Sequence, residues 1–248
     1  MKITLVIPCY NEELNIQKGV LDKIGNYTKN SPYFGEVLII DDGSSDDSKN
    51  IIKEKYLKVF PKFRLIENLH KGKAFAVITG IEKAKEEYVI FSDIDLATPI
   101  EEAQNLINEA ENGYKIVIGS RSSKRQGAPF LRKVMAFAAI LVQNIIIGLQ
   151  GIKDTQCGFK LFETKTALRI INKLKVFHNN LRIEGSSVSA GFDMEFLFVA
   201  AKLRVKIKET HVDWKHVETK HVNFFKDSFE GLKDILLIKY YDLTHRYD

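Results

Sequence analysis

The sequence predicts an α/β fold built on a parallel sheet that helices cover on both faces. Short strands that are apolar throughout recur along the first half of the chain, and segments of about ten to fifteen residues with helical periodicity separate them. The composition is that of a globular protein, because 45% of the 248 residues are hydrophobic and 28% are charged. A chain of this length forms a core without disulfide bonds.

The expected strands and helices alternate in order along the chain. The strands span residues 3–7, 37–40, 64–66, 88–91 and 115–118. The helices span residues 12–24, 48–60, 73–85 and 99–111. Farther along, we expect Pro129 to begin an apolar helix that continues to residue 149, because proline favours the first position of a helix. An amphipathic helix is expected over residues 224–241 near the C-terminus.

The charge of the chain is unevenly distributed. The 37 Lys and Arg residues against 32 Asp and Glu give a formal charge of +5, which by itself does not indicate nucleic acid binding. Residues 112–153, however, contain no acidic residue and several basic ones. The basic residues are Lys115, Arg121, Lys124, Arg125, Arg132, Lys133 and Lys153. Such a segment suits an anionic partner, whether a phosphate, a lipid head group or a nucleic acid.

The sequence favours a cytoplasmic protein that does not cross a membrane. Cys9 and Cys157 are too few for a disulfide scaffold and lack metal-ligand spacing, so a reducing compartment is expected. Pro8 and the polar residues 11–13 close the first apolar run too early for an export signal. Residues 134–149 are interrupted by Gln143 and Asn144 and are too short for a bilayer span.

Polar residues follow each of the five expected strands. They occupy residues 8–13, 41–47, 68–73, 92–95 and 119–121. Each group has a plain structural explanation as turn formers and helix caps, and Ser45 or Asp46 is expected to cap the following helix. All five together favour a ligand site, because ligands bind beyond the carboxyl ends of parallel strands.

Asp93 and Asp95 are the first candidates for metal binding. Two carboxylates separated by one residue at a strand end can share Mg²⁺ or Mn²⁺, which prefer oxygen ligands and complete their shell with substrate phosphates. A cluster of Asp42, Asp93 and Asp95 would repel itself without a cation. The sequence therefore predicts a site for a divalent ion and a phosphorylated ligand.

These motifs resemble the family-2 glycosyltransferases of the GT-A fold. The matching segments are residues 8–12, 41–46, 71–74 and 92–95, in order and spacing. Residues 94–99, 119–121 and 154–162 look like the dolichyl-phosphate glucosyltransferase branch, and the related mannosyltransferases are similar in the N-terminal half. Residues 192–195 and 212–214 extend the resemblance over nearly the whole chain.

The resemblance implies one domain over residues 1–248 with a Rossmann-like, mostly parallel sheet and C-terminal amphipathic helices. Residues 1–120 would form the nucleotide-sugar-binding half, and residues 121–248 the half that meets the acceptor and the membrane interface. Nucleotide-binding roles are implied for Pro8, Tyr10, Glu12, Ile40, Asp42, Lys73, Asp93 and Ile94, with Asp42 on the base. Asp95, with Asp93, would hold the metal, and Arg121 and Arg132 would grip the acceptor phosphate. Ala97 stands where some relatives have a metal-contacting glutamine.

The expected reaction is the inverting transfer of a hexose, with UDP-glucose as the favoured donor, to dolichyl or undecaprenyl phosphate. An ionised phosphate is already a nucleophile, so a strong general base is not required. Two alternatives within the family are a GDP-mannose-dependent transferase and a transferase that acts on a sugar hydroxyl with Asp193 or Glu195 as base. A sugar-nucleotide pyrophosphorylase would need a glycine-rich loop after the first strand. A module that only binds membrane or nucleic acid would leave Asp42, Asp93 and Asp95 unexplained.

The acid-free segment suggests how the chain reaches its acceptor. The helix over residues 130–149 is expected either in the core or, slightly favoured, at the interface of a membrane on whose cytosolic face the protein lies. No nucleic acid partner is expected. Cys157 and the histidines at 211, 216 and 221 are interpreted as packing and surface residues. Residues 177–191 are longer than expected for the family, and we expect a loop over the acceptor site.

Overall fold

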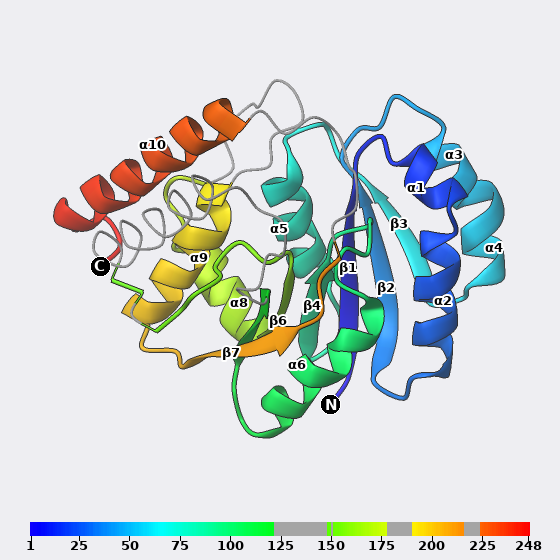
Figure 1. The fold of residues 1–248 in the computed structure, drawn as a ribbon, viewed down its shortest axis with the longest axis horizontal. Helices are drawn as coiled ribbons and strands as arrows, with labels where there is room; N and C mark the ends of the chain where they lie inside the picture. The colour runs from blue at the N-terminus through cyan, green and yellow to red at the C-terminus, as the bar shows by residue number, and fades with distance from the viewer. Residues whose placement is uncertain (122–147, 150, 178–189, 216–223) are drawn as a thin grey trace.

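The computed structural model describes residues 1–121, 148–149, 151–177, 190–215 and 224–248. A seven-stranded sheet forms its centre, with the strand order β3-β2-β1-β4-β6-β5-β7, and helices lie on both faces (Figure 1). The strands are β1 (Ile3–Cys9), β2 (Phe34–Asp41), β3 (Phe63–Glu67), β4 (Tyr88–Ser92), β5 (Ile116–Arg121), β6 (Phe159–Glu163) and β7 (Ile207–Val212).

All strands of this sheet except β6 run in the same direction. β1 pairs in parallel with β2 and β4, and β2 pairs in parallel with β3. β6 lies antiparallel between β4 and β5, and β5 pairs in parallel with β7. The prediction of a mostly parallel sheet is therefore confirmed. The parallel strands end at one edge of the sheet, and the end of β1 lies toward the top of Figure 1.

The helices divide between the two faces of the sheet. They are α1 (Glu13–Gln17), α2 (Val20–Asn30), α3 (Ser48–Ile51), the π-helical η1 (Ile52–Tyr56), α4 (Leu57–Val59), α5 (Lys73–Lys83), the 3₁₀-helical η2 (Ile100–Glu102), α6 (Ala103–Glu111), α8 (Thr164–Ile171), α9 (Ala190–Lys202) and α10 (Phe224–Leu243). One core cluster joins the sheet to α1, α2 and α6. The other joins it to α5, α8, α9 and α10.

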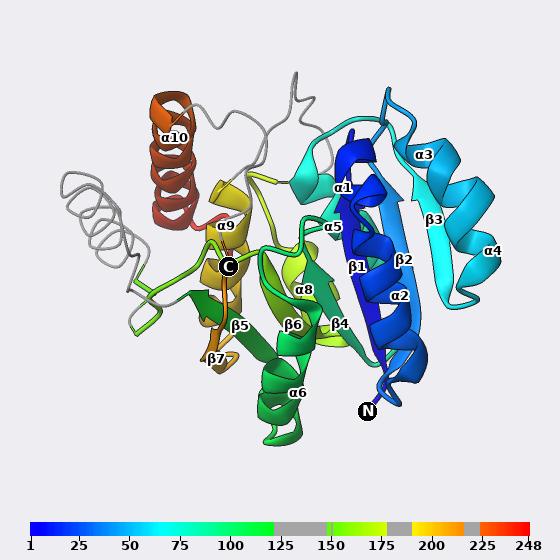
Figure 2. The ribbon, with the colours of Figure 1, turned by 45° about the vertical axis from the view of Figure 1, so that its right-hand side comes forward.

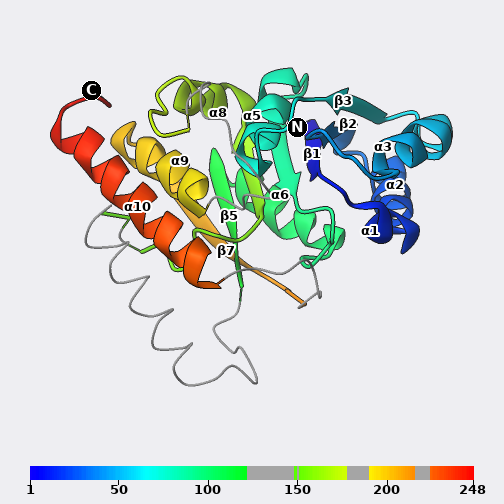
Figure 3. The same ribbon diagram turned by 90° about the horizontal axis from the view of Figure 1, so that it is seen from above.

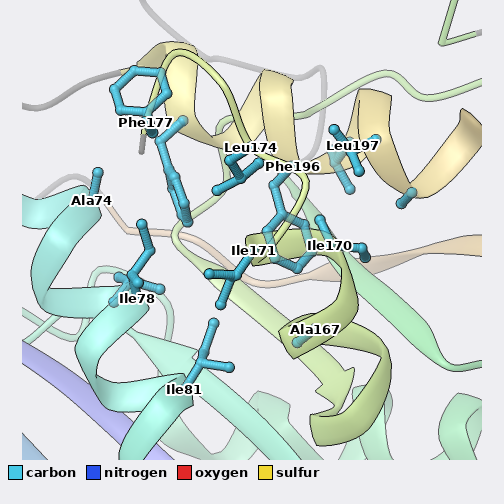
Figure 4. Packing of buried hydrophobic residues seen from close by; sticks show 14 of the residues in the cluster. Ala74, Ile78, Ile81, Ala167, Ile170, Ile171, Leu174, Phe177, Phe196 and Leu197 are labelled. Atoms are coloured by element: carbon cyan, nitrogen blue, oxygen red, sulfur yellow. The ribbon is translucent and has the colours of Figure 1, made fainter. Parts of the chain in front are cut away.

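The second cluster explains how the C-terminal half is held against the first. Ile78 and Ile81 of α5 face Ile171 of α8, and Phe196 of α9 packs above them (Figure 4). α10 lies along α9 in two views (Figure 2 and Figure 3). A Cβ atom on Gly191 would overlap the side chain of Asp234 in α10, so the two helices approach closely there.

Two of the expected helices differ in detail. The helix expected over residues 12–24 is broken into α1 and α2 at Gly19, whose φ of 80° is left-handed and cannot continue a helix. The segment expected as one helix over residues 48–60 is helical from Ser48 to Val59 but contains the π-helical turn η1. The N-cap of α3 is Asp47 rather than the expected Ser45 or Asp46, although the Asp46 carboxylate accepts a hydrogen bond from Ser48 N at 3.1 Å.

The second half contains elements that were not among those expected from the sequence. β6, α8, α9 and β7 are among them, whereas α10 is the helix expected over residues 224–241. The helix expected from Pro129 to residue 149 lies almost entirely outside the described residues. In the described part of the chain, none of the helices combines the length and the apolar character that a membrane span requires.

Candidate active site

The loops after β1 and β2 are joined by hydrogen bonds. Asn11, in a left-handed conformation with φ of 53°, donates its backbone N–H to Ser44 Oγ at 2.9 Å. Its side-chain oxygen accepts from Ser45 N at 2.7 Å. Pro8 of β1 pairs with Ile40 of β2, which is fully buried. The two predicted nucleotide-binding segments therefore form one continuous wall.

Glu12 is oriented by the first turn of the neighbouring helices. Its backbone N–H donates to Ser48 Oγ at 2.8 Å, and its carboxylate accepts from Asn15 Nδ2 at 2.6 Å. Asp46 accepts from Glu13 N and from Ser48 N, both at 3.1 Å. One carboxylate thus binds the backbone N–H of the first residue of both α1 and α3, which holds Glu12 at the sheet edge.

Asp42, for which the resemblance implies a contact with the nucleoside base, is bound to the loop before α5. Its side chain is 2% exposed and accepts hydrogen bonds from Lys71 N at 3.0 Å and Gly72 N at 2.7 Å, with His70 Nδ1 at 2.8 Å. In this structure Asp42 therefore holds the loop before α5. The flat surface beside it is made by Tyr10 and His70, whose rings stack with centroids 4.1 Å apart. His70 lies in the expected ligand-site segment 68–73, but nothing in the sequence indicated that its ring stacks on Tyr10.

Lys73 is the first residue of α5 and pairs with Asp93, which follows β4. Lys73 Nζ lies 2.5 Å from Asp93 Oδ1. Burial alone would lower the pKa of Lys73, but the charges of Asp93, Asp193 and Asp95 outweigh burial and raise it. The lysine is therefore a fixed positive charge between the two halves of the chain.

Asp95 stands in a tight turn after β4. Leu96 has a left-handed φ of 51°, and Ala97 N donates to Asp95 Oδ1 at 3.0 Å. Burial raises the pKa of Asp95, and the charge of Asp93 raises it further. The charged form of this carboxylate is therefore less favourable here than in water, mainly because of burial. Ile94, between the two carboxylates, is buried in the core.

The residues present fit a divalent ion for which the protein supplies only some of the ligands. Among the described residues, no group of three or more His, Cys, Asp or Glu side chains could hold a metal. Asp95 and Asp93 would supply oxygen ligands, and a bound diphosphate would have to complete the shell.

The segment before β6 brings a glycine against the acidic pair. A Cβ atom on Gly158 would overlap the carboxylate of Asp93, so the backbone approaches this side chain as closely as glycine allows. Cys157 is buried, its thiol lies near Gly119, and burial raises its pKa to about 11. This is the packing role expected for Cys157.

Arg121 at the end of β5 is paired with Asp154. Its Nε and Nη2 donate to the two oxygens of Asp154 at 2.7 and 2.8 Å, and its backbone N–H donates at 3.0 Å. Burial alone would raise the pKa of Asp154, but the hydrogen bonds and charge of Arg121 outweigh it and lower the pKa. The pair uses two of the five guanidinium donors, so Arg121 is oriented by Asp154 whether or not it binds the acceptor.

Two acidic residues of α9 have partners within the protein. Asp193 accepts from Lys160 Nζ at 2.7 Å, and Lys160 is 1% exposed. Glu195 is fully buried and accepts from the backbone N–H groups of residues 175–177 and from Tyr247 Oη at 2.6 Å. The sequence assigned Lys160 no role of its own, although a lysine within an apolar segment indicates a buried ion pair.

The remaining sequence predictions divide by location. Arg132 lies outside the described residues, as do His216, His221 and residues 178–189. His211 is exposed on β7, as expected for a surface residue. The edge of the sheet thus brings together Tyr10, Glu12, Lys73, Asp93, Asp95 and Arg121.

The fold is that of the GT-A glycosyltransferases. It matches the crystal structure of glucosyl-3-phosphoglycerate synthase from Mycobacterium tuberculosis in complex with Mn²⁺, uridine-diphosphate-glucose and phosphoglyceric acid. The TM-score is 0.66 at 15% identity, covering 96% of this chain and 79% of that chain. At this identity the similarity establishes the fold alone.

The family model described as glycosyl transferase family 2 matches residues 4–175, and the chain belongs to this family. The dolichyl-phosphate beta-glucosyltransferase of Dictyostelium discoideum is 31% identical over 96% of this chain and 74% of its own length. The human protein of the same name is 30% identical over 98% of this chain and 76% of its own length. The resemblance noted in the sequence is therefore confirmed.

Proposed function

We propose that the protein transfers a hexose, with glucose from UDP-glucose as the favoured case, onto a polyprenyl phosphate such as dolichyl or undecaprenyl phosphate. The observation that carries this proposal is the similarity to dolichyl-phosphate beta-glucosyltransferases over nearly the whole chain. The contact between Gly158 and Asp93 supports it, because the segment most typical of that branch meets the acidic pair directly.

The donor would lie across the carboxyl edge of β1, β2 and β4. Tyr10 offers a ring to a nucleoside base, and Glu12 offers a carboxylate that Asn15 already orients. Lys73 supplies positive charge beside Asp93, where a diphosphate would approach. The sheet edge therefore carries groups suited to each part of a sugar nucleotide.

Asp95, together with Asp93, would hold Mg²⁺ or Mn²⁺. Bound there, such an ion neutralises the charge that develops on the departing nucleoside diphosphate. A cation there would also counteract the raised pKa of Asp95, which results first from burial and then from the charge of Asp93. Lys73 would add a second positive charge from the protein itself.

The acceptor phosphate needs orientation more than deprotonation. A phosphate monoester has a second pKa near ~6 and is largely ionised at neutral pH. Arg121, fixed by Asp154, would present its remaining donors to that phosphate, in the role also expected for Arg132. Direct displacement would invert the anomeric carbon. A hydroxyl acceptor would need a general base. Asp193 is paired with Lys160 and Glu195 is fully enclosed, so neither carboxylate is placed to act as that base.

We also propose that the protein lies on the cytosolic face of a membrane. α10 exposes apolar side chains at positions spaced by three or four residues, which is one face of a helix. They are Leu232, Leu236, Tyr240 and Leu243, with exposed fractions of 44%, 54%, 54% and 69%. The acid-free residues 112–153 would add attraction to an anionic surface.

The test is transfer of labelled sugar to polyprenyl phosphate in anionic vesicles. We expect label from UDP-glucose to move into the lipid phase with Mn²⁺ and not with a chelator, and the product to be β-linked. Label from GDP-mannose serves as the matched comparison. Preferred transfer from GDP-mannose would overturn the glucose assignment, and no transfer from any sugar nucleotide would overturn the proposal.

A further inference from the structure

A small polar pocket lies beside the acidic pair. Its volume is about 50 Å³. Its walls include Ser92, Asp93, Thr98, Gln156, Gly158 and Trp214. It therefore joins three segments that are distant in sequence: the end of β4, the segment before β6 and the end of β7. Gln156 and Trp214 are the exposed residues among these walls.

The chemistry of this pocket fits a neutral polyhydroxylated group. Hydroxyl, carboxylate and amide side chains line it together with one aromatic ring, and a few placed polar groups beside an aromatic surface are typical of a specific small-molecule site. Arg121 also borders the pocket, but its charge is offset by the carboxylate of Asp154. The polar walls consequently suit sugar hydroxyls, which both donate and accept hydrogen bonds, and Arg121 at the border keeps its remaining donors for a phosphate.

Trp214 is fixed at the rim of this pocket. The next residue, Lys215, donates its backbone N–H to Ala97 O at 2.8 Å, and Ala97 N in turn donates to Asp95. Arg121 lies over the indole ring, with 5.8 Å between the guanidinium carbon and the ring centroid. Trp214 is nevertheless 40% exposed. An aromatic surface is thus held next to the metal-binding turn while part of it faces solvent.

Gln156 belongs to the same segment as the glycine that meets Asp93. Its side chain is exposed, and the pocket lies between it and Asp93. A side-chain amide both donates and accepts hydrogen bonds, as a sugar hydroxyl does. Gln156 and Trp214 therefore offer the two kinds of contact, polar and apolar, that distinguish one hexose from another.

We propose that Trp214 and Gln156 recognise the hexose of the nucleotide-sugar donor and set which hexose is accepted. The inference rests on the proposed function and deepens it, because it assigns the sugar to the pocket beside Asp93. Trp214 contacts the C–H face of the ring, and Gln156 contacts its hydroxyls. The volume of about 50 Å³ accommodates only one end of a hexose, so the remainder lies against the exposed part of Trp214.

The first test uses Trp214 as its own probe, since it is the only tryptophan of the sequence. The full chain with Mn²⁺ is titrated with UDP and with UDP-glucose, and tryptophan emission and its quenching by acrylamide are recorded. UDP-glucose is expected to protect the indole from acrylamide and UDP is not. Equal protection by both ligands would overturn the proposal.

The second test compares Trp214→Ala, Trp214→Phe and Gln156→Ala with His211→Ala, an exposed neighbour on β7. We expect Trp214→Ala and Gln156→Ala to weaken binding of UDP-glucose about ten-fold and binding of UDP little, as the loss of one contact to the sugar predicts. Trp214→Phe and His211→Ala should retain the preference for UDP-glucose over UDP-galactose. Unchanged sugar preference in Trp214→Ala and Gln156→Ala, with wild-type transfer of glucose intact, would overturn this inference alone. Absence of nucleotide-sugar binding by the wild-type chain would overturn the proposed function with it.

Discussion

Gly158 and Asp93 are in such close contact that no side chain fits between them. The two residues come from different motifs of the sequence, one after β4 and one before β6. Antiparallel pairing of β4 with β6, in which Ser92 lies opposite Phe159, brings them together. The only antiparallel strand of the described sheet is therefore the one that completes the acidic site.

Gly158→Ala is expected to lose transfer activity while remaining folded. The added methyl group overlaps the end of the Asp93 side chain, which can rotate away but then leaves Lys73. A displacement of this size at a reacting centre costs about 10²-fold in rate. Initial rates of transfer measure the loss of activity, and the thermal midpoint of unfolding shows whether the variant remains folded. A variant with wild-type rates would show that the position of Asp93 does not matter.

Asp95→Asn is expected to abolish metal-dependent binding of UDP-glucose without loss of stability. The carboxylate is partly buried beside Asp93, and its raised pKa, caused first by burial, indicates that its charge is unfavourable in the metal-free protein. Removing that charge should leave the unfolding midpoint unchanged or higher. Calorimetric titration with Mn²⁺ and UDP-glucose measures the first effect, with Asp213→Asn, exposed on the surface, as control. Unaltered Mn²⁺ affinity in Asp95→Asn would remove the metal assignment.

Asp154→Asn is expected to destabilise the fold by about 3 kcal/mol, because breaking a largely buried pair leaves Arg121 uncompensated. The pKa of Asp154 is lowered in the folded protein, so its stabilising effect is present above the unfolded value of 3.8 and is lost as pH falls through the folded pKa. The variant should therefore lose less stability on acidification than the wild type. Denaturant unfolding at pH 7 and near pH 3.5 measures both, and an identical acid dependence would contradict the pairing.

Lys160→Met is expected to destabilise the protein by about 3 kcal/mol, since it leaves Asp193 without its buried partner. The double variant Lys160→Met with Asp193→Leu should recover part of this loss of stability.

Asp193→Asn alone is expected to retain the rate of transfer to a phosphate acceptor within about ten-fold, because such an acceptor needs no general base. Removal of a true general base would lower the rate by up to about 10⁴-fold. Loss on that scale would identify Asp193 as a base and contradict the proposed acceptor chemistry.

Leu236→Gln is expected to reduce flotation with anionic vesicles. The side chain is 54% exposed on α10, and burying a leucine in an apolar phase contributes roughly 1.5–3 kcal/mol. Lys233→Gln, exposed on the same helix, should mainly change the salt dependence of binding, as screening of a surface charge predicts. Equal flotation of Leu236→Gln and the wild type at all salt concentrations would show that this face does not meet the lipid.

The sequence predicted the first five strands and the edge at which they end, because each strand contains an apolar run that polar residues close. It did not predict α9, which carries buried apolar side chains around most of its circumference and so lacks an amphipathic period. β6 was obscured by Lys160, whose charge is compensated by a residue 33 positions away.

The partners of the site residues were also beyond the sequence. Asp42, Asp93 and Arg121 were all selected as functional, yet nothing in their spacing indicates that Asp42 binds the backbone of its neighbouring loop or that Arg121 binds Asp154. Such pairings depend on how distant segments pack. The sequence could therefore identify the residues at the sheet edge but not the hydrogen bonds that orient them.

The enclosure of Glu195 has a mechanical consequence. This one carboxylate ties α9 to residues 175–177 and to Tyr247, which follows α10. Displacement of α10 by a lipid surface would therefore be transmitted to α9. Asp193 lies on α9 two residues before Glu195, so its ion pair with Lys160 would be displaced as well. Attachment to a bilayer and the arrangement of charges at the sugar-transfer site are consequently expected to change together.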